Sequence, residues 1–521
     1  MKYLNYITLF VVGLLLTGCY KDLGNYDYNE INEVKFSGFP TEKQFAFRNV
    51  DSIKVYPDIE GTLQEKDLSH YSFKWEAVVK EGAADGKTNF PLDSNTVNLE
   101  YFVKLPDAEY SVYLYVKDET TNVTWRQAFD LKVTTSLNEG WMILSDEQGF
   151  CRLDVVSLSG KDELLVRDIW AGTPLATRKG PRQIGHWADM YEAGSGNHPV
   201  YLVTDDGGVK LNNEDFSYDP VNELQYEFGL YPEGFIPWCM AGNYMDCWRI
   251  CICNKGVYTK SEMTSGAIYG IPINKIEGEK DYYGVAPAIG MSPYAYNMGP
   301  AIVLYDTTNR RFVQVTSNLR GTRLPTTPET VFPFKTGKKF VYMTSTLHDT
   351  YGYVFTILKD DAAKLWLYGL KMGYGSTMTQ ASQYYYQLDA PDINKATCFA
   401  VHPILYYLFY AVGNQIHQFD MVTKEHRILP MTFEEGERNS LPENKITLLK
   451  FNPFILSTYG KPADIALLQN YLIIGSEKEG AALGGVVRML EIPTAMDKSA
   501  TVKKTYEGFG KVVDVVYRER K

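Results

Sequence analysis

Apolar and polar residues alternate with a period of two in short runs over residues 34–136. This period places successive side chains on opposite faces of a strand, and turn-forming residues separate the runs, so the pattern predicts strands. About six or seven strands around one central tryptophan, Trp75, are typical of a small β-sandwich. The predicted strands are residues 34–36, 52–56, 71–76, 97–99, 110–116 and 128–133.

From Gly140 onward the pattern changes to pairs of apolar strands joined by tight turns. The clearest unit is Phe409–Thr423, in which an apolar strand, a Gly-Asn turn, an alternating strand and a polar turn follow one another. The pairs begin roughly 40 to 65 residues apart, near the length of a four-stranded propeller blade. The seven predicted hairpins join residues 141–144 with 150–153, 200–203 with 208–211, 248–253 with 256–258, 301–305 with 311–315, 340–343 with 353–356, 405–411 with 415–420, and 471–474 with 486–490.

This repetition predicts an all-β chain that ends in a β-propeller over residues 140–521. Seven blades are expected, with eight as the alternative because residues 431–465 are difficult to assign. The last run, Gly510–Tyr517, is a strand without a hairpin partner. We expect it to complete the first blade, since this closure removes exposed sheet edges.

The N-terminus has the pattern of an export signal. Lys2 precedes the apolar run Ile7–Leu16, which is too short to span a bilayer, so residues 1–18 are expected to form a secretory signal peptide. The sequence Leu-Leu-Thr-Gly-Cys that ends at Cys19 resembles a bacterial lipobox, in which the cysteine is acylated and becomes the new N-terminus. We expect a lipid anchor at Cys19, with an ordinary signal peptide as the alternative.

Residues 19–33 are polar and rich in Gly, Asn and Asp, so they are expected to form a tether that starts at the lipidated cysteine. Lys21-Asp22 resembles the signal that sends some lipoproteins to the outer face of the outer membrane. Display on the cell exterior is therefore expected, with a solvated linker and periplasmic display as the alternative.

The charge and the cysteines narrow the function classes. The net charge of −11 becomes −12 without Lys2, and no stripe of Lys and Arg is visible, so nucleic acid is not expected as a partner. Cys251 and Cys253 fall on one face of a predicted strand, which indicates core packing. A metal cluster with Cys239 and Cys247 is the alternative.

No catalytic motif is recognised, and no cofactor is expected. The seven histidines never have metal-ligand spacing. Gly290-Met291-Ser292-Pro293-Tyr294 lacks the second glycine of a nucleophile elbow. Paired carboxylates are the remaining enzymatic option. The acidic pairs Asp205-Asp206 and Asp360-Asp361 lie in predicted turns, where solvated corners are expected.

Aromatic residues make up 14% of the chain, and many lie in predicted loops. Sugars stack on aromatic faces, and peptides also bind to tyrosine and tryptophan. Residues 170–198, 231–246, 281–298 and 374–392 are long enough to build a binding face between blades. Capping of the propeller core and contact with partner proteins are the alternatives. The predicted ligand-binding residues are Trp170, Arg182, Trp187, Trp238, Tyr294, Tyr296 and Tyr384.

Phe73-Lys74-Trp75 and Ala108–Asp118 resemble the two hallmark strands of PKD domains, which are immunoglobulin-like sandwiches. The order of lipobox, tether, PKD-like domain over residues 34–136 and repetitive β region resembles the PKD-like surface lipoproteins of starch-utilisation-type uptake loci. The resemblance implies an accessory subunit in the outer membrane, beside a TonB-dependent transporter and its lid lipoprotein. Such subunits are thought to help capture oligopeptides or glycans.

The leading hypothesis is a non-enzymatic subunit of a nutrient importer that binds the ligand or the transporter through its propeller. A surface hydrolase, either a glycosidase or a peptidase, is the second hypothesis. An adhesin built on the PKD-like domain is the third.

Overall fold

The computed structural model describes residues 32–518 except 64–66, 85, 138, 159–162, 187–198, 214, 244–247, 262–266, 293–300 and 453–466. The chain divides into two compact units, Met1–Val133 and Thr134–Lys521. Within the described residues no helix is long and apolar enough to cross a membrane. Six short 3₁₀ turns lie among the described residues: η1 (Pro174–Thr177), η2 (Pro220–Asn222), η3 (Leu224–Glu227), η4 (Ser382–Tyr384), η5 (Ile393–Lys395) and η6 (Leu468–Asn470).

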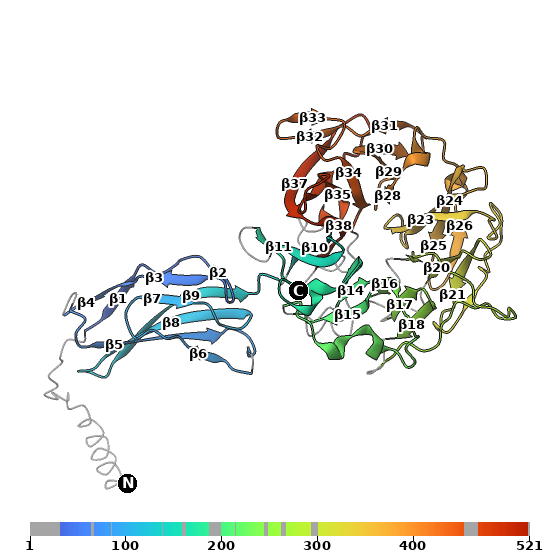
Figure 1. Cartoon of the computed structure of the whole chain (residues 1–521). Coiled ribbons are helices and arrows are strands. Elements are labelled where there is room, and N and C mark those ends of the chain that lie inside the picture. Colours follow the sequence, from blue (N-terminus) through green and yellow to red (C-terminus); the bar gives the residue numbers. More distant parts are fainter. Residues whose placement is uncertain are drawn as a thin grey trace, which may run out of the picture. The chain divides into compact units, whose positions relative to one another are not determined.

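The first unit is a β-sandwich, with one large sheet in the strand order β2-β9-β8-β5-β6 and the pairs β1–β4 and β3–β7 (Figure 1). Both layers contribute side chains to one core. Trp75 is fully buried there, and its indole N–H donates to the carbonyl of Thr96 at 3.1 Å. The strands are β1 (Val34–Ser37), β2 (Gln44–Phe47), β3 (Ser52–Val55), β4 (Asp58–Gly61), β5 (Tyr71–Val79), β6 (Asn89–Pro91), β7 (Leu99–Phe102), β8 (Ala108–Asp118) and β9 (Thr124–Thr134).

Each strand predicted for this unit overlaps an observed strand. The three that the pattern missed, β2, β4 and β6, have only three or four residues each. A run of that length is too short to show alternation against its surroundings, and its pairing partner decides that it is a strand.

The second unit is a β-propeller with seven sheets arranged in a ring (Figure 1). All seven predicted hairpins are antiparallel pairs, one in each sheet. The second blade contains β13 (Pro181–His186), β14 (Val200–Thr204) and β15 (Gly207–Leu211), and the third contains β16 (Pro237–Asn243), β17 (Trp248–Cys253) and β18 (Gly256–Ser261). The fourth blade contains β19 (Gly290–Met291), β20 (Ile302–Asp306), β21 (Arg311–Val315) and β22 (Thr322–Arg323). The fifth contains β23 (Lys339–Thr346), β24 (Tyr353–Lys359), β25 (Leu365–Met372), β26 (Met378–Gln380) and β27 (Tyr386–Gln387), and the sixth contains β28 (Cys398–Val401), β29 (Tyr407–Val412), β30 (Gln415–Asp420) and β31 (His426–Ile428).

The first blade is closed by the end of the chain, as predicted. Strand β38 (Lys511–Arg518) pairs antiparallel with β10 (Gly140–Glu147), which continues to β11 (Phe150–Ser157) and β12 (Leu164–Val166). Gly140 begins β10 with a φ of 144°, and a Cβ there would collide with the carbonyl oxygen of Val156. Trp141 and Tyr517 pack edge to face across the pair, with ring centroids 5.0 Å apart.

Asp514 of β38 connects the first blade to its neighbours on both sides. One carboxylate oxygen accepts the backbone N–H of Ile184 on β13 at 3.2 Å, and the other lies 2.7 Å from the Lys450 ammonium. These contacts join the inner strands of three consecutive blades, so the ring is closed by more than one strand pair.

The seventh blade is larger than the others. It contains β34 (Lys445–Lys450), β35 (Tyr471–Glu477), β36 (Gly485–Glu491) and β37 (Ala500–Phe509), and a ribbon of β32 (Met431–Phe433) and β33 (Gly436–Arg438) extends it. The described part of residues 431–465 forms this ribbon and the inner strand β34, so it does not make an eighth blade. The described residues of the second unit therefore form seven blades and no eighth.

Cys251 and Cys253 confirm the prediction of core packing. Both are buried on one face of β17 in the same core cluster. Cys239 packs against a different cluster, because its strand partner is Ile252 and its side chain points to the opposite face. Burial raises the pKa of the Cys253 thiol to about 11, which keeps it protonated. Cys247 lies outside the described residues.

Ring closure can be tested with Trp141→Ala. Trp141 is 1% exposed, so we expect its removal to lower the free energy of unfolding by about 3–5 kcal/mol. Urea unfolding followed by far-UV circular dichroism measures this change. The control is Tyr374→Ala, because Tyr374 is 55% exposed and should cost less than about 0.5 kcal/mol. Equal losses in the two variants would contradict the role given to Trp141.

Candidate functional site

Four of the residues singled out from the sequence lie outside the described part of the chain. These are Cys19, Trp187, Tyr294 and Tyr296. Their predicted roles, lipidation for Cys19 and ligand binding for the other three, stay predictions.

Trp170 and Tyr384 correct the prediction of an aromatic binding face. Trp170 is 1% exposed and donates its indole N–H to the carbonyl of Phe216 at 3.1 Å. Tyr384 is 3% exposed and packs edge to face on Phe355 at 5.2 Å. Both side chains fill the wedge-shaped space between neighbouring sheets, so they do not face a ligand. The alternative role, capping of the propeller core, describes them better.

Arg182 and Trp238 lie on the innermost strands of the second and third blades. Arg182 is exposed and its Nε lies 2.5 Å from the Asp205 carboxylate. Trp238 is half-buried against the core cluster between the third and fourth blades. Since Trp170, Trp238 and Tyr384 belong to three different core clusters, the structure does not bring these three described residues into one site.

Three of the four carboxylates predicted to lie at solvated corners are exposed, whereas Asp360 is half-buried and accepts the indole N–H of Trp366 at 2.9 Å. Asp205, Asp206 and Asp361 are exposed, and Asp206 accepts the backbone N–H of Lys179 at 2.7 Å. The carboxylates of Asp205 and Asp361 pair with Arg182 and Arg310.

Tyr384 belongs to a stack of rings between the fifth and sixth blades. Tyr406 stacks on Tyr384 at 5.4 Å and on His348 at 4.2 Å. Burial lowers the pKa of His348 to about 4 and that of His402 to about 3, so both imidazoles are neutral near pH 7. Neutral rings fit this packing because a buried cation without a partner is costly.

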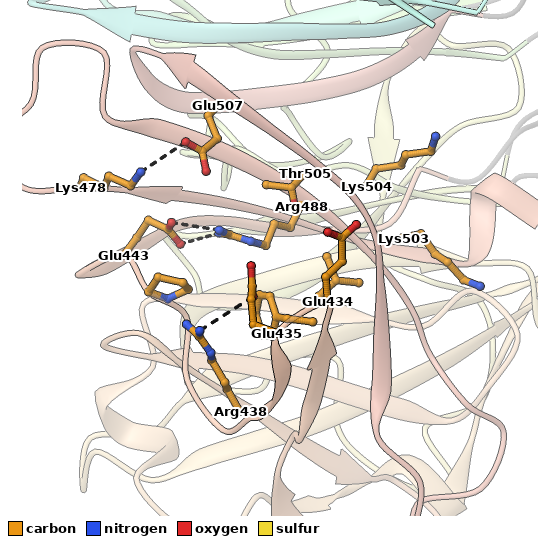
Figure 2. A pocket seen from close by; sticks show the side chains of 13 residues that line it. Glu434, Glu435, Arg438, Glu443, Lys478, Arg488, Lys503, Lys504, Thr505 and Glu507 are labelled. Atoms are coloured by element: carbon orange, nitrogen blue, oxygen red, sulfur yellow. Dashed lines mark hydrogen bonds and ion pairs between the residues drawn. The ribbon is translucent and has the colours of Figure 1, made fainter. Parts of the chain in front are cut away.

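A pocket of about 410 Å³ lies on the seventh blade, between the β32–β33 ribbon and the outer strand β37. Figure 2 shows charged side chains of both signs projecting around it. It is lined by Phe433, Glu434, Glu435, Arg438, Pro442, Glu443, Lys478, Arg488, Val502, Lys503, Lys504, Thr505 and Glu507.

The innermost polar groups of this pocket are Arg488 and Glu443. Two bonds of 2.5 and 3.0 Å join the guanidinium to the carboxylate, with the side chains 5% and 1% exposed. Ser476 donates a third bond to Glu443 at 3.2 Å. A buried carboxylate needs such partners, and the bidentate geometry holds both side chains in one orientation.

Further ion pairs surround this central pair (Figure 2). Lys478 lies 3.3 Å from Glu507, and Arg438 lies 3.8 Å from Glu435. Lys503 and Lys504 also have acidic partners, outside the pocket lining. Among the described residues, Glu434 has no ion-pair partner, so its carboxylate is left to attract a cation.

This arrangement suits binding of a polar ligand that carries charge. The lining offers cations, carboxylates, a threonine hydroxyl and one phenyl ring. Within the described ranges no three His, Cys, Asp or Glu side chains are grouped to hold a metal ion.

The sequence pattern missed this pocket because its residues are far apart in the chain and individually ordinary. Glu434-Glu435-Gly436 has the composition of a solvated turn, and the flanking strands have three residues each. The one sequence feature that indicates an irregularity here is that residues 431–465 do not follow the pattern of a regular blade. Only the pairing of β32 with β37 brings the ribbon beside the outer strand.

The sequence model of the PKD-like family matches residues 19–176 of this chain. The match covers the sandwich and extends into the first propeller blade as far as η1. No curated protein matches the sequence.

Solved structures with a similar course of the chain are distant. A quinonprotein alcohol dehydrogenase-like protein from Bacteroides thetaiotaomicron is 11% identical, with 93% of this chain and 96% of that chain covered and a TM-score of 0.38. The WD40 domain of SCAP from fission yeast is 9% identical, with 73% and 75% covered and a TM-score of 0.23. The extracellular domain of a putative one component system from Bacteroides thetaiotaomicron is 9% identical, with 84% and 60% covered and a TM-score of 0.25.

Fold and family match together define the class. The protein is all-β, with a PKD-like N-terminal domain of immunoglobulin-like sandwich form followed by a β-propeller whose described residues form seven blades.

The buried ion pair of the pocket can be tested with Glu443→Gln. This change leaves the Arg488 charge uncompensated, so we expect the free energy of unfolding to fall by about 3–5 kcal/mol. Chemical denaturation measures the loss. Glu507→Gln is the matched control, because its pair with Lys478 is exposed and should contribute at most about 1 kcal/mol. The assignment would be contradicted if Glu443→Gln lowered the free energy of unfolding only slightly and if adding Arg488→Met to that variant changed it no further.

The neutral state of His348 predicts a dependence of stability on pH. Its pKa in the folded protein, about 4, lies below its usual 6.5, so the unfolded chain binds the proton first as the pH falls. The contribution of neutral His348 to the free energy of unfolding is therefore fully present above pH 6.5 and is lost as the pH falls from 6.5 to 4, by about 3 kcal/mol in total. Denaturation curves of the wild type and His348→Phe across this range measure the difference. If the free energy of unfolding depended on pH in the same way in His348→Phe and in the wild type, the stabilising role of neutral His348 would be contradicted.

Proposed function

We propose that the protein is a non-enzymatic cell-surface lipoprotein, an accessory subunit of a TonB-dependent importer of oligopeptides or glycans. The observation that carries this proposal is that the PKD-like family match begins at Cys19, the residue that the lipobox-like sequence marks for acylation. Acyl chains on Cys19 would anchor the protein, since each buried methylene contributes about 0.8 kcal/mol. The polar residues 20–33 would then separate the two β units from the membrane.

The propeller is the part that meets ligand or transporter in this proposal. A closed ring of seven sheets is a rigid scaffold, and rigid scaffolds lose little entropy on binding. Its pocket on the seventh blade offers charges of both signs to solvent. The partners are the transporter, its lid lipoprotein and other surface lipoproteins, at the outer membrane and facing the exterior.

The contacts of the pocket favour binding over hydrolysis. Glu443 accepts two bonds from Arg488 and one from Ser476, so the most buried carboxylate of the lining is already engaged by three protein donors. A general acid or base must instead reach the substrate and exchange a proton. A glycosidase or peptidase, or an adhesin, is the competing function. Turnover of a glycan or peptide library by the purified protein would replace this proposal with the hydrolase.

Anchoring can be tested with Cys19→Ala in the native host. We expect wild-type protein extracted in detergent to co-purify with the transporter and its lid lipoprotein. The Cys19→Ala protein should leave the membrane fraction and lower nutrient uptake, because the acyl chains hold it beside the transporter. Cys398→Ala is the control, since it removes a half-buried thiol of the sixth blade and should remain in the membrane. Wild-type protein that never carries the transporter, or normal uptake with Cys19→Ala, would contradict the subunit role.

A further inference from the structure

The outer strand of the seventh blade has an edge that is only partly paired. Strand β37 pairs with β36 from Thr501 to Phe509. On its other side, within the part of the chain that the structure describes, β32 pairs with only two of its residues, Ala500 and Thr501. Beyond Thr501 the ribbon leaves β37, and the pocket opens between them, lined by five residues of the strand between Val502 and Glu507.

The register indicates which backbone groups face this opening. Ala500 turns its N–H away from β36 and donates it to the carbonyl of Pro430 at 2.9 Å. A register shift in the β36–β37 pair adds one residue, Lys503, to β37. Along a strand, residues alternately direct their backbone N–H and C=O groups toward one neighbouring strand and toward the other. The extra residue shifts this alternation by one position, so Thr505 and Glu507 direct their N–H and C=O groups outward, away from β36.

An extended peptide is complementary to such an edge. Strand addition satisfies the open N–H and C=O groups with the peptide backbone, and neighbouring pockets receive the side chains. Five steps along a strand, from Val502 to Glu507, extend for about 17 Å. This length corresponds to about six residues of an extended peptide.

The charges of the pocket indicate which peptide fits. Glu434 lines the pocket and, among the described residues, has no ion-pair partner. Its carboxylate is complementary to an ammonium group, which a peptide supplies at its free N-terminus or on a lysine. Every basic residue of the lining already has an acidic partner. A peptide with a cationic group is therefore favoured over an anionic one.

The lining is less suited to a glycan. Sugars commonly stack on an open aromatic face. The one aromatic side chain of the lining, Phe433, already has the guanidinium groups of Arg438 and Arg488 over its ring, 5.5 and 5.7 Å from the centroid.

We propose that the open edge of β37 binds a short extended peptide by strand addition, with a cationic group of the peptide at Glu434. This inference rests on the proposed function and specifies oligopeptide as the ligand class. The known use of charged residues on sheet edges is to prevent pairing with other chains, so the competing view is that Lys503, Lys504 and Glu507 keep this edge free.

Binding can be tested with the detergent-solubilised full chain and an equimolar mixture of random hexapeptides. Hexapeptides retained by the protein are identified by mass spectrometry, and one of them is resynthesised with N-methyl groups at alternate positions. We expect at least about tenfold weaker binding of the N-methylated peptide, because it lacks backbone donors. We also expect slower amide hydrogen exchange of residues 502–507 when the unmodified peptide is bound.

Two substitutions separate backbone pairing from charge recognition. Thr505→Pro removes an outward N–H and should bind about tenfold more weakly than Thr505→Val, which keeps this N–H and lacks only the hydroxyl group. Glu434→Gln should weaken binding of the free peptide about tenfold. It should not change binding of an acetylated peptide that lacks lysine. If Thr505→Pro fails to fold, the N-methylated peptide still tests the pairing.

Three outcomes would overturn the inference. They are no retained hexapeptide, equal affinity for the N-methylated peptide, and protection of residues 502–507 by neutral glucan oligosaccharides instead of peptides. Each concerns the ligand site alone, since the subunit role is tested by co-purification with the transporter. A failure of one proposal is therefore distinguishable from a failure of the other.

Discussion

The pairing of β38 with β10 is the constraint on which the second unit depends. It joins the last strand of the chain to the first blade, so no sheet in the ring is left without a neighbour. Asp514 extends this closure to the inner strands of the adjacent blades through Ile184 and Lys450. Because loop closure over such a sequence distance is entropically unfavourable, the apolar contacts of Trp141 and Tyr517 must offset it. The rigid ring then holds the surface loops and pocket in place.

The charged pocket arises where the seventh blade departs from the regular blade pattern. A two-stranded ribbon adds to the outer strand for two residues and then leaves it, which opens a space along the strand edge. The Arg488–Glu443 pair holds the inner wall, since both side chains are buried and joined by two bonds. A regular four-stranded blade would leave β37 with a flat, open edge. The ribbon adds a second wall beside this edge and so forms a pocket lined by charged side chains.

The aromatic residues show why large side chains in predicted loops are a weak indication of a binding face. Sheets in a ring diverge toward the outside, and bulky rings are needed to fill the space between them. Trp170 and Tyr384 do this, although neither belongs to a strand. Tyr384 continues the ring stack to Tyr406 and His348, whose pKa is low because of its burial. The pocket in which we propose that a ligand binds is lined instead by charged side chains at a strand edge.

The sequence by itself determined the all-β class, the seven hairpins, the closing strand and the common face of Cys251 and Cys253. These features depend on alternation between neighbouring residues and on local turns, which a sequence displays directly. Tertiary structure alone decided the short strands of the sandwich, the burial of Trp170 and Tyr384, and the pocket on the seventh blade. Each depends on contacts between residues distant in the chain, such as Glu443 with Arg488 or Met431 with Ala500, and no local pattern records such contacts.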